Sequence, residues 1–401
     1  MRIYKVASLF AGCGGTDIGI TGGFKFRERT YERHPTELVY ANDFDEGACD
    51  LFDRNFDIRI DRSDIRKVDP NRIPKFDILT AGFPCQSFSI VAQNPPRLGI
   101  KDSDKGTLFE EVCRFLQEQK PMAFMCENVK GILSANKGQA FPIILESLRR
   151  CGYHVTHMLL NASKFGVPQR RERVFIVGFR DPTVFSRFSP PKEVEWAEVL
   201  GSVLMDEKTI PSKYYFSERA VAGMLAAKKE MNKGRAQQLD KPCNTVGAHL
   251  SKVSLNSTDP VLKINERYRR FVPREVARIQ SFPDSYILEG AESRQYKALG
   301  NAIPPILAWH VMNSIRKALD PDIKDGKIRF ENEDKAKENW SEKHIKFPQT
   351  SQMLLAIERK KAKMSAKEKA SGLKGKTYSL TGKPKKGRAA KVRMSRAAYK
   401  K

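Results

Sequence analysis

Apolar stretches separated by turn-forming residues recur along the first 180 residues of this 401-residue chain. Each stretch has the length and composition of a buried strand, and the clearest lie at residues 5–10, 38–41, 76–81, 122–126 and 174–178. Between them, apolar residues recur three and four positions apart, which is typical of helices with one buried face. Strands that alternate with helices predict an α/β fold with a mostly parallel sheet and helices on both faces.

The pattern changes at residue 181, where prolines and a lysine-rich helical piece over 220–233 replace the regular alternation. Helical periodicity returns at Pro273, and proline is favoured at the first position of a helix. A final apolar helix is expected to open at residues 299–305 and to run through Ile315. We therefore expect four parts: a first domain at 1–180, a smaller domain at 181–298, a returning helix at 299–320, and a basic, partly disordered extension at 321–401.

The net charge of +25 points to a polyanionic partner, and much of it lies at the end of the chain. Residues 359–401 hold 17 Lys and Arg against the single acid Glu368, a balance of +16, which leaves +9 for residues 1–358. Few large apolar residues accompany this charge, so the segment is not expected to form its own core. Such a segment attracts phosphates without carrying sequence information.

Features of the whole chain argue against several classes of protein. No run of about 18 apolar residues is present, so we expect no transmembrane helix, and the first residues carry no signal-peptide pattern. Seven cysteines, an odd number without a C-x-x-C pair, argue against a disulfide framework and a zinc ribbon. We therefore expect a reduced, cytoplasmic protein without a membrane partner.

Turns with candidate chemistry follow the first three predicted strands. Gly12–Gly15 follow the first strand, and glycines let a backbone approach a ligand closely, although a simple tight turn is the alternative. Asp43 follows the second strand, where an acid can bind ribose hydroxyls or cap the next helix. Cys85 follows the third strand on a loop of the kind that binds ligands in α/β sheets. A lone free cysteine is more often a small buried side chain.

Two further polar clusters accompany the fourth and fifth strands. Glu127 follows the fourth strand, where a carboxylate can act as a general acid or can accept backbone hydrogen bonds as a structural group. Arg170, Arg171 and Arg173 precede the fifth strand, and arginines beside a core strand are more specific than arginines on a helix surface. A solvated ion-pair cluster is the alternative.

Together, these stretches resemble the motifs of the DNA (cytosine-5) methyltransferase family, of the bacterial restriction–modification type. Six motifs match in order and span residues 5–318, which makes the set specific although each motif alone is weak. The variable segment 181–265 and the extension contain none of them. The matching stretches are Phe10–Gly15, Gly82–Gln86, Glu127–Val129, Gln169–Arg173, Arg274–Glu275 and Gly300–Asn301.

The resemblance implies a Rossmann-like S-adenosylmethionine-dependent methyltransferase fold and a covalent mechanism. Carbon 5 of cytosine is a poor nucleophile, and addition of a thiolate at carbon 6 makes it electron-rich. Cys85 is the expected nucleophile, and Glu127 is expected to hold or donate a proton at nitrogen 3 of the base. Arg171 and Arg173 are expected to orient the base and to neutralise developing charge. The base that removes the carbon 5 proton is not identified.

The resemblance also implies S-adenosyl-L-methionine as methyl donor, S-adenosyl-L-homocysteine as product, and no metal. Asp43 is expected on the ribose hydroxyls and Phe44 on the adenine, where family members often have Glu and Trp. The residues expected to bind the cofactor are Phe10, Gly12, Gly14, Gly15, Asp43, Phe44, Asp64, Ile65, Pro84, Leu108 and Asn301.

Double-stranded DNA is the implied substrate, and its target cytosine must flip out of the duplex to reach Cys85. The 1–180 domain would then be catalytic and the 181–298 domain would recognise the target. Because the variable segment 181–265 resembles a target-recognition region, it favours DNA over transfer RNA, which one branch of the family methylates. The residues expected to contact DNA are Gln86, Ser89, Asn244, Thr245 and His249.

The implied biological setting is a bacterial, nucleoid-associated monomer. It would protect DNA at the site of a cognate restriction endonuclease without forming a stable complex with that enzyme, and an orphan enzyme is the alternative. A catalytically silent DNA-binding relative is a further alternative, against which the presence of Cys85 and Glu127 argues.

Overall fold

The computed structural model describes residues 2–84, 108–226, 236–252, 259–322 and 326–330. Residues Met1–Glu333 form one compact unit. Three residues with expected roles, Cys85, Gln86 and Ser89, lie outside the described residues, so their roles stay predictions.

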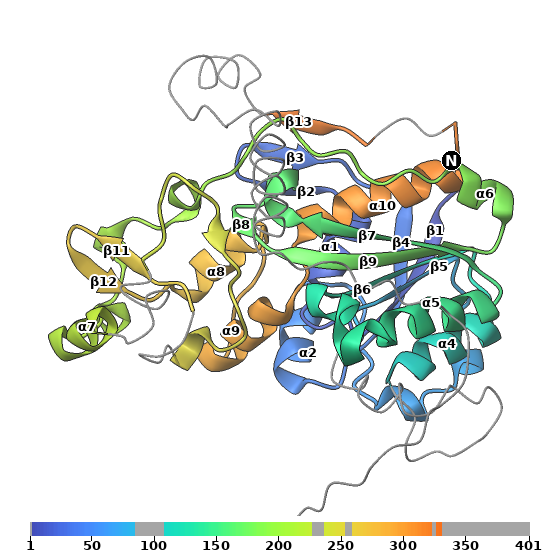
Figure 1. Ribbon diagram of the computed structural model, residues 1–401, viewed down its shortest axis with the longest axis horizontal. Coiled ribbons are helices and arrows are strands. Elements are labelled where there is room, and N and C mark those ends of the chain that lie inside the picture. The colour runs from blue at the N-terminus through green and yellow to red at the C-terminus, as the bar shows by residue number, and fades with distance from the viewer. Residues whose placement is uncertain (1, 85–107, 227–235, 253–258, 323–325, 331–401) are drawn as a thin grey trace, which may run out of the picture. The chain divides into compact units, whose positions relative to one another are not determined.

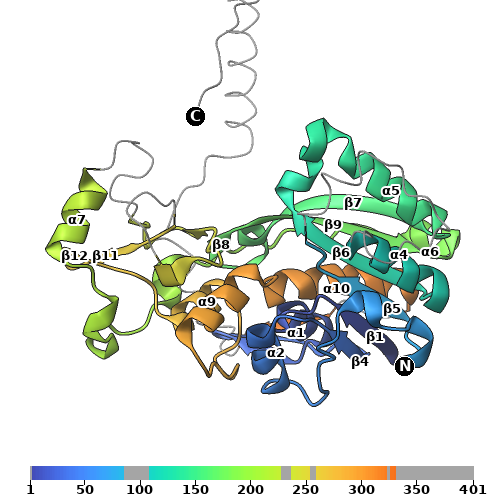
Figure 2. The same ribbon diagram turned by 90° about the horizontal axis from the view of Figure 1, so that it is seen from below.

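A six-stranded sheet forms the centre of this unit (Figures 1 and 2). The first four strands across the sheet are parallel, and the last two pair antiparallel with their neighbours. In spatial order the strands are β4 (Thr36–Asn42), β1 (Tyr4–Leu9), β5 (Ile78–Ala81), β6 (Ala123–Val129), β9 (Glu172–Phe179) and β7 (His154–Asn161). This arrangement confirms the predicted α/β fold with a mostly parallel sheet.

Strand β9 lies between β6 and β7 and runs against both of them. The register places Val129, the last residue of β6, opposite Arg173 near the start of β9. Because β9 is antiparallel, residues that precede it lie at the same sheet edge as the carboxyl ends of the parallel strands. Ligands bind beyond this edge in α/β sheets.

Helices on the two faces of the sheet form two hydrophobic cores. Residues of α1 (Gly15–Thr21), α2 (Glu46–Asp53), α6 (Pro182–Arg187) and α10 (Pro305–Leu319) contribute to one core, and those of α4 (Leu108–Gln119) and α5 (Ala140–Arg150) to the other. Figure 2 shows α4 and α5 on one side of the sheet and α1 and α2 on the other.

The helices α1 and α10 pack unusually closely. A Cβ added at Gly19 of α1 would lie 2.3 Å from the carbonyl oxygen of Pro305 in α10. Because no side chain fits in that space, glycine is required at this crossing.

Smaller elements between α6 and α10 form a less regular part of the body, on the left of Figure 1. Arg269 is fully buried there, and its guanidinium forms ion pairs with Glu275 at 2.7 Å and with Glu207 at 2.5 Å. The expected domain boundaries 181–298 stay a prediction. The elements of this part are α7 (Glu218–Leu225), β10 (Cys243–Asn244), β11 (Leu262–Ile264), β12 (Arg267–Arg269), α8 (Pro273–Ile279) and α9 (Glu292–Asn301).

Short elements complete the fold. Strand β10 pairs in parallel with β8 (Gln169–Arg170), which directly precedes β9. Single turns of 3₁₀ helix lie at Ile65–Lys67, Pro70–Arg72, Lys130–Leu133, Ala135–Gly138, Ala162–Phe165, Leu200–Val203, Glu207–Thr209, Ser212–Tyr214 and Leu250–Lys252.

A small sheet pairs the last described residues of the chain with two strands near its N-terminus. Strand β13 (Ile328–Phe330) pairs antiparallel with β3 (Arg29–Tyr31), which pairs with β2 (Phe24–Phe26). The N–H of Lys327 donates to Oε2 of Glu32 at 2.8 Å, and Ile328 packs against the core. The sequence analysis did not predict this strand within the extension.

The final helix agrees with its prediction except at its start. A helix that opens at residues 299–305 and runs through Ile315 was expected, and α10 runs from Pro305 to Leu319, whereas residues 299–301 end α9. Pro304 and Pro305 explain the break, because proline lacks the N–H that a continuous helix needs and clashes with the preceding turn. Asn301 therefore lies at a helix end.

Candidate active site

The loop after β1 forms one side of the candidate site. Phe10, Gly12 and Gly14 have φ of 55°, 58° and 83°, in the left-handed region that favours glycine. A Cβ at Gly14 would lie 2.2 Å from the ring of Phe56, and one at Gly15 would lie 2.4 Å from the carbonyl oxygen of Ile303. A Cβ at Gly12 would meet no atom of the described residues within 4 Å, so among these residues nothing fills this side of the loop.

Asp43 connects this loop to the end of β4. Its Oδ2 accepts a hydrogen bond from the N–H of Gly12 at 2.8 Å, and its Oδ1 accepts one from the N–H of Asp45 at 2.9 Å. Burial raises the pKa of Asp43, and these two hydrogen bonds oppose the rise. Both carboxylate oxygens therefore help to hold the turn, and each retains a lone pair for a ligand hydroxyl.

The other expected cofactor residues lie on neighbouring turns. The ring of Phe44 is 74% exposed, so its aromatic face is accessible beside the end of β4. Asp64 accepts a hydrogen bond from the N–H of Arg66 and forms an ion pair with its guanidinium, whereas Ile65 is buried. Asn42, the last residue of β4, holds the turn that contains Asp64 beside this strand, because its Nδ2 donates to the carbonyl oxygen of Ser63 at 2.9 Å.

Three further cofactor candidates are Pro84, Leu108 and Asn301, of which the first two border residues 85–107. Pro84 is the last described residue before 85–107, and Leu108 is the first residue of α4. Asn301 is the exposed last residue of α9, two positions before the Ile303 carbonyl that approaches Gly15. The structure thus brings the loop after β1 close to the turn that follows α9.

The segment that leads to Cys85 passes between the loop after β1 and Glu127. A Cβ at Gly82 would lie 3.6 Å from the carbonyl oxygen of Phe10 and 3.9 Å from Oε2 of Glu127. The side chain of Asn128 holds the next residue of this segment in place, because its Nδ2 donates to the carbonyl oxygen of Phe83 at 2.9 Å. Sequence reasoning gave Asn128 no role, although it lies within a matching motif.

Glu127 pairs with Arg173 across β6 and β9. The Nε atom of Arg173 lies 2.9 Å from Oε1 of Glu127, and each side chain is 12% exposed. Burial raises the pKa of Glu127 above its ordinary value, while Arg173 and Arg171 lower it. A carboxyl group with a raised pKa at the end of a strand is suited to proton transfer.

Arg171 has a different environment from Arg173. It is 1% exposed, and its Nη1 and Nη2 donate to the carbonyl oxygens of Val246 at 3.1 Å and Gly300 at 2.9 Å. Burial is the main cause that lowers its pKa to about 9, so the guanidinium is still charged at neutral pH. The expected role of Arg171 in orienting a base stays a prediction, and its observed contacts hold other segments in place.

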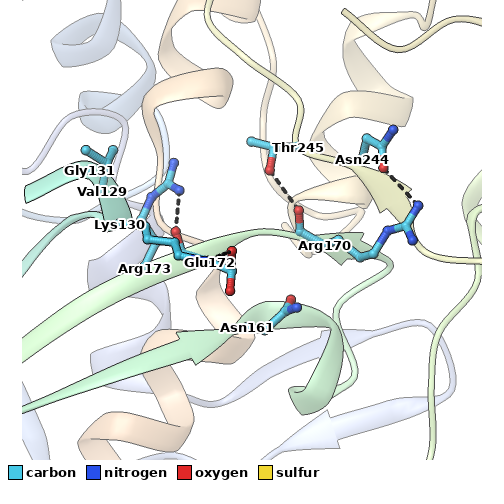
Figure 3. A pocket seen from close by; sticks show the side chains of 9 residues that line it. All are labelled: Val129, Lys130, Gly131, Asn161, Arg170, Glu172, Arg173, Asn244 and Thr245. Carbon is cyan, nitrogen blue, oxygen red and sulfur yellow. Dashed lines mark hydrogen bonds and ion pairs between the residues drawn. The ribbon is translucent and has the colours of Figure 1, made fainter. Parts of the chain in front are cut away.

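A cavity of about 600 Å³ is lined in part by Arg173, the residue that pairs with Glu127 (Figure 3). Lys130 forms an ion pair with Glu172 at 2.9 Å, Nη2 of Arg170 donates to Oδ1 of Asn244 at 2.9 Å, and the hydroxyl of Thr245 donates to the carbonyl oxygen of Arg170 at 2.7 Å. The cavity is lined by Val129, Lys130, Gly131, Asn161, Arg170, Glu172, Arg173, Asn244 and Thr245.

The cavity contains only part of the expected DNA-contacting set. Asn244 and Thr245 line it, whereas His249 is exposed and is not among its lining residues. Lys130 and Asn161 were not identified from the sequence. Lys130 directly follows a matching motif, and Asn161 ends β7, a strand that the sequence analysis did not predict.

The part of the chain that the structure describes contains neither a membrane-spanning helix nor a cluster of metal ligands. None of its helices is long and apolar enough to cross a membrane. Within the same residues, no group of three or more His, Cys, Asp or Glu side chains is placed to hold a metal ion.

Solved structures with a similar fold are methyltransferases. The Entamoeba histolytica methyltransferase EhMeth has a TM-score of 0.62 at 15% identity and covers 80% of this chain and 100% of its own. A mutant form of DNMT2 from Spodoptera frugiperda has a TM-score of 0.60 at 19% identity and covers 78% of this chain and 99% of its own. At these identities the likeness supports the fold alone.

Sequence relatives define the family. The model of the C-5 cytosine-specific DNA methylase family matches residues 4–317. The type II methyltransferase M1.ScrFI of Lactococcus lactis subsp. cremoris is 34% identical over 316 residues, or 76% of each chain. The type II methyltransferase M.HpaII of Haemophilus parainfluenzae is 33% identical over 332 residues, covering 76% of this chain and 87% of its own.

The chain therefore belongs to the C-5 cytosine-specific DNA methylase family. It is a DNA (cytosine-5) methyltransferase, as the order of its motifs predicted.

Proposed function

We propose that this methyltransferase transfers a methyl group from S-adenosylmethionine to carbon 5 of a flipped-out cytosine in one double-stranded DNA sequence. The buried Glu127–Arg173 pair carries the proposal, because it lies beside the segment that leads to Cys85. An acid, a cation and a nucleophile loop at one sheet edge suit covalent addition to a pyrimidine.

The proposed mechanism assigns one step to each side chain. Cys85, which lies outside the described residues, adds to carbon 6 as a thiolate and makes carbon 5 nucleophilic. Once carbon 5 carries the methyl group, a base removes its proton, and the electron pair that is released re-forms the ring double bond and expels the Cys85 thiolate. Glu127 binds nitrogen 3 and holds a proton there as charge moves onto the ring, which its raised pKa supports. Arg173 positions the Glu127 carboxyl group and stabilises developing negative charge.

The site proposed for S-adenosylmethionine lies at the same edge of the sheet, beyond strands β1 and β4. The side of the loop at Gly12 that no described residue fills, the exposed ring of Phe44 and the carboxylate of Asp43 offer room for a ligand, an aromatic surface and a hydroxyl acceptor. The bound cofactor supplies the electrophilic methyl group. We propose that the loop after β1 holds its methionine part, with Asn301 at the far end, and that Asp64, Ile65, Pro84 and Leu108 complete the site.

DNA is proposed to pass over the cavity of Figure 3. Lys130, Arg170 and Arg173 give its lining three positive charges against the one negative charge of Glu172. Cations of this kind bind phosphates and fix the register of a duplex, while base contacts provide specificity. We assign the base contacts to the 181–298 segment, in which His249, Asn244 and Thr245 offer polar groups.

We further propose that the protein acts in a bacterial restriction–modification system, as a cytoplasmic monomer. The support is the similarity to chains described as type II methyltransferases. Protection requires only that the enzyme and an endonuclease recognise the same DNA sequence, so no stable complex between them is needed.

Bisulfite sequencing tests the proposed function. The protein is expressed in bacterial cells that lack their own cytosine methylation, and 5-methylcytosine is expected within one short DNA sequence at all of its copies. Cys85→Ser, expressed at the same level, is the matched control and should leave the DNA unmethylated. Unmethylated DNA together with methylated transfer RNA would overturn the assignment of the substrate.

A further inference from the structure

Three segments that are far apart in the sequence meet behind the candidate active site. They are residues 169–171 at the start of the catalytic arginine motif, residues 246–248 beyond β10, and residues 299–302 around the end of α9. A Cβ on Gly300 would lie 2.3 Å from the carbonyl carbon of Gly247, which shows how closely the last two approach. The proposed function places a different task in each segment: base handling, DNA recognition and cofactor binding.

Two buried glutamines connect the three segments through their side-chain amides. Gln169 and Gln280 are both fully buried. The N–H of Val246 donates to Oε1 of Gln169 at 3.0 Å, and Nε2 of Gln169 donates to Oε1 of Gln280 at 2.7 Å. Nε2 of Gln280 donates to the carbonyl oxygens of Leu299 at 2.6 Å and Ala302 at 3.3 Å.

The backbone groups at the two ends of this series of hydrogen bonds determine how both side-chain amides are oriented. A backbone N–H can only donate and a backbone carbonyl can only accept, so Val246 selects the oxygen of Gln169 and Leu299 selects the nitrogen of Gln280. These two choices agree, because the remaining nitrogen of Gln169 then faces the remaining oxygen of Gln280. Neither amide can flip alone without placing like groups against each other at both ends.

Arg171 reinforces the same junction. Its Nη1 donates to the carbonyl oxygen of Val246 and its Nη2 to that of Gly300. Val246 is therefore held by its N–H through Gln169 and by its carbonyl through Arg171. A displacement of Val246 must strain hydrogen bonds that reach the end of α9, where Asn301 lies.

We propose that Gln169 and Gln280 form an amide relay that couples DNA binding at the recognition segment to the affinity for the cofactor. The inference rests on the proposed function, because it needs both ligands. Both glutamines are positioning residues, since they are fully buried and their amides bond to each other and to backbone groups. Leaving a buried amide unpaired is costly, so the recognition segment and the backbone around Asn301 shift together when DNA binds.

The experiment measures the affinity for S-adenosylhomocysteine by calorimetry, alone and with a duplex that carries the site found by bisulfite sequencing. In the unaltered protein the duplex should tighten binding by at least about fivefold, the lower end of typical couplings. Gln280→Met keeps the size of the side chain and removes its amide. Without DNA, the affinity of this variant for S-adenosylhomocysteine should stay within about twofold of that of the unaltered protein. The ratio of its affinities with and without the duplex should fall to about one.

A second variant gives a readout that depends on pH. In Gln169→Glu, an ionised carboxylate would face Oε1 of Gln280, so the coupling should be lost at high pH. Protonation supplies an O–H donor in place of the amide N–H, so the coupling should return as the pH falls. Gln295→Met is the matched control, because Gln295 is also buried and bonds through Nε2 to the carbonyl oxygen of Gly290, outside the junction.

Several outcomes would overturn the relay. One is an unaltered protein without coupling, and another is a Gln280→Met variant that unfolds at the normal temperature and retains full coupling. If Gln280→Met does not fold, the pH series on Gln169→Glu decides, and a coupling independent of pH would contradict the proposal. Failure of the proposed function is distinguishable, because it appears earlier as the absence of 5-methylcytosine.

Discussion

The Nε atom of Arg173 lies 2.9 Å from Oε1 of Glu127, and the pair is nearly buried. The two residues come from adjacent antiparallel strands, β6 and β9. Burial raises the pKa of Glu127 and Arg173 lowers it, so the charge state of this carboxyl group depends on two opposing effects. Substitution of Glu127 or of Arg173 can separate these two effects.

Glu127→Gln should slow methyl transfer by about 100- to 10,000-fold, the usual range for general acid–base catalysis. The amide retains the size and hydrogen-bonding capacity of the side chain but cannot supply a carboxyl proton. Single-turnover kinetics measure this step, and the affinity for S-adenosylhomocysteine is the control that should not change. A rate within about threefold of the unaltered enzyme, far below that range, would exclude proton transfer by Glu127.

Arg173→Gln should move the alkaline limb of the rate profile to higher pH. Arg173 lowers the pKa of Glu127, so its removal raises that pKa further, and the carboxyl group stays protonated to a higher pH. The overall rate should fall, because the cation that stabilises developing charge is lost. Single-turnover rates across pH give the limb, and Lys130→Gln, which removes a cation paired with Glu172 instead, should leave the limb in place.

Cys85→Ser should abolish methyl transfer without changing the temperature of unfolding. A serine hydroxyl is far less acidic than a thiol, so it does not add to carbon 6 of the base. DNA with 5-fluorocytosine at the target should trap the unaltered enzyme as an adduct that survives denaturant. Equal trapping by the serine variant would show that Cys85 is not the nucleophile.

Two buried histidines should make the protein sensitive to acid. Burial is the main cause that lowers the pKa of His34 to about 3 and that of His310 to about 4, against an ordinary value near 6.5. Stability is therefore fully present above pH 6.5 and is lost as the pH falls toward these values, because only the unfolded chain binds the protons.

His310→Phe should remove half of this effect. Between pH 7 and pH 5, one such histidine costs about 2 kcal/mol of unfolding free energy, which the phenylalanine variant should not lose. Urea unfolding at the two pH values measures the difference. His154→Phe, at an exposed position on β7, is the control, and an equal pH dependence of His310→Phe and the unaltered protein would contradict the assignment.

Strand β13 should mark the end of the stable body. A chain that ends at Glu333 retains it, whereas one that ends at Pro321 loses the pairing with β3 and the packing of Ile328. Each lost hydrogen bond between β13 and β3 contributes about 1 kcal/mol to stability. The free energy of unfolding of the shorter chain should therefore be lower by about 1–3 kcal/mol. Thermal unfolding compares them, and equal stability would show that β13 contributes nothing. The full chain should match the one that ends at Glu333.

The sequence was sufficient for the fold class and for the order of the motifs. Strongly apolar strands and glycine turns are local signals, and they located β1, β4, β5, β6 and β9 to within a few residues. Glu127 and Arg173, which were expected just outside the fourth and fifth strands, lie inside β6 and β9. The insertion of β9 between β6 and β7 is a long-range choice that local signals do not contain. Strand β7 was missed, and with it Asn161 at its end.

The candidate site was predicted as a set of residues rather than as an arrangement. Glu127 and Arg173 were identified together, and the structure pairs them directly. The contacts of Arg171 with Val246 and Gly300 could not be foreseen, because they join segments about 75 and 129 positions away. Lys130 and Gln280 were missed for the same reason, since nothing in their own neighbourhood signals a partner far along the chain.

The close crossing of α1 and α10 has a consequence for synthesis. The N-terminal helix leaves the ribosome early, but its partner surface around Pro305 is made almost 290 residues later. At typical bacterial elongation rates this gap lasts roughly 15 to 60 s. During that time α1 lacks the surface of α10 against which Gly19 packs, so the loop after β1, which directly precedes this helix, is not yet held in its final position. Each new molecule therefore begins to methylate DNA only after α10 has been made.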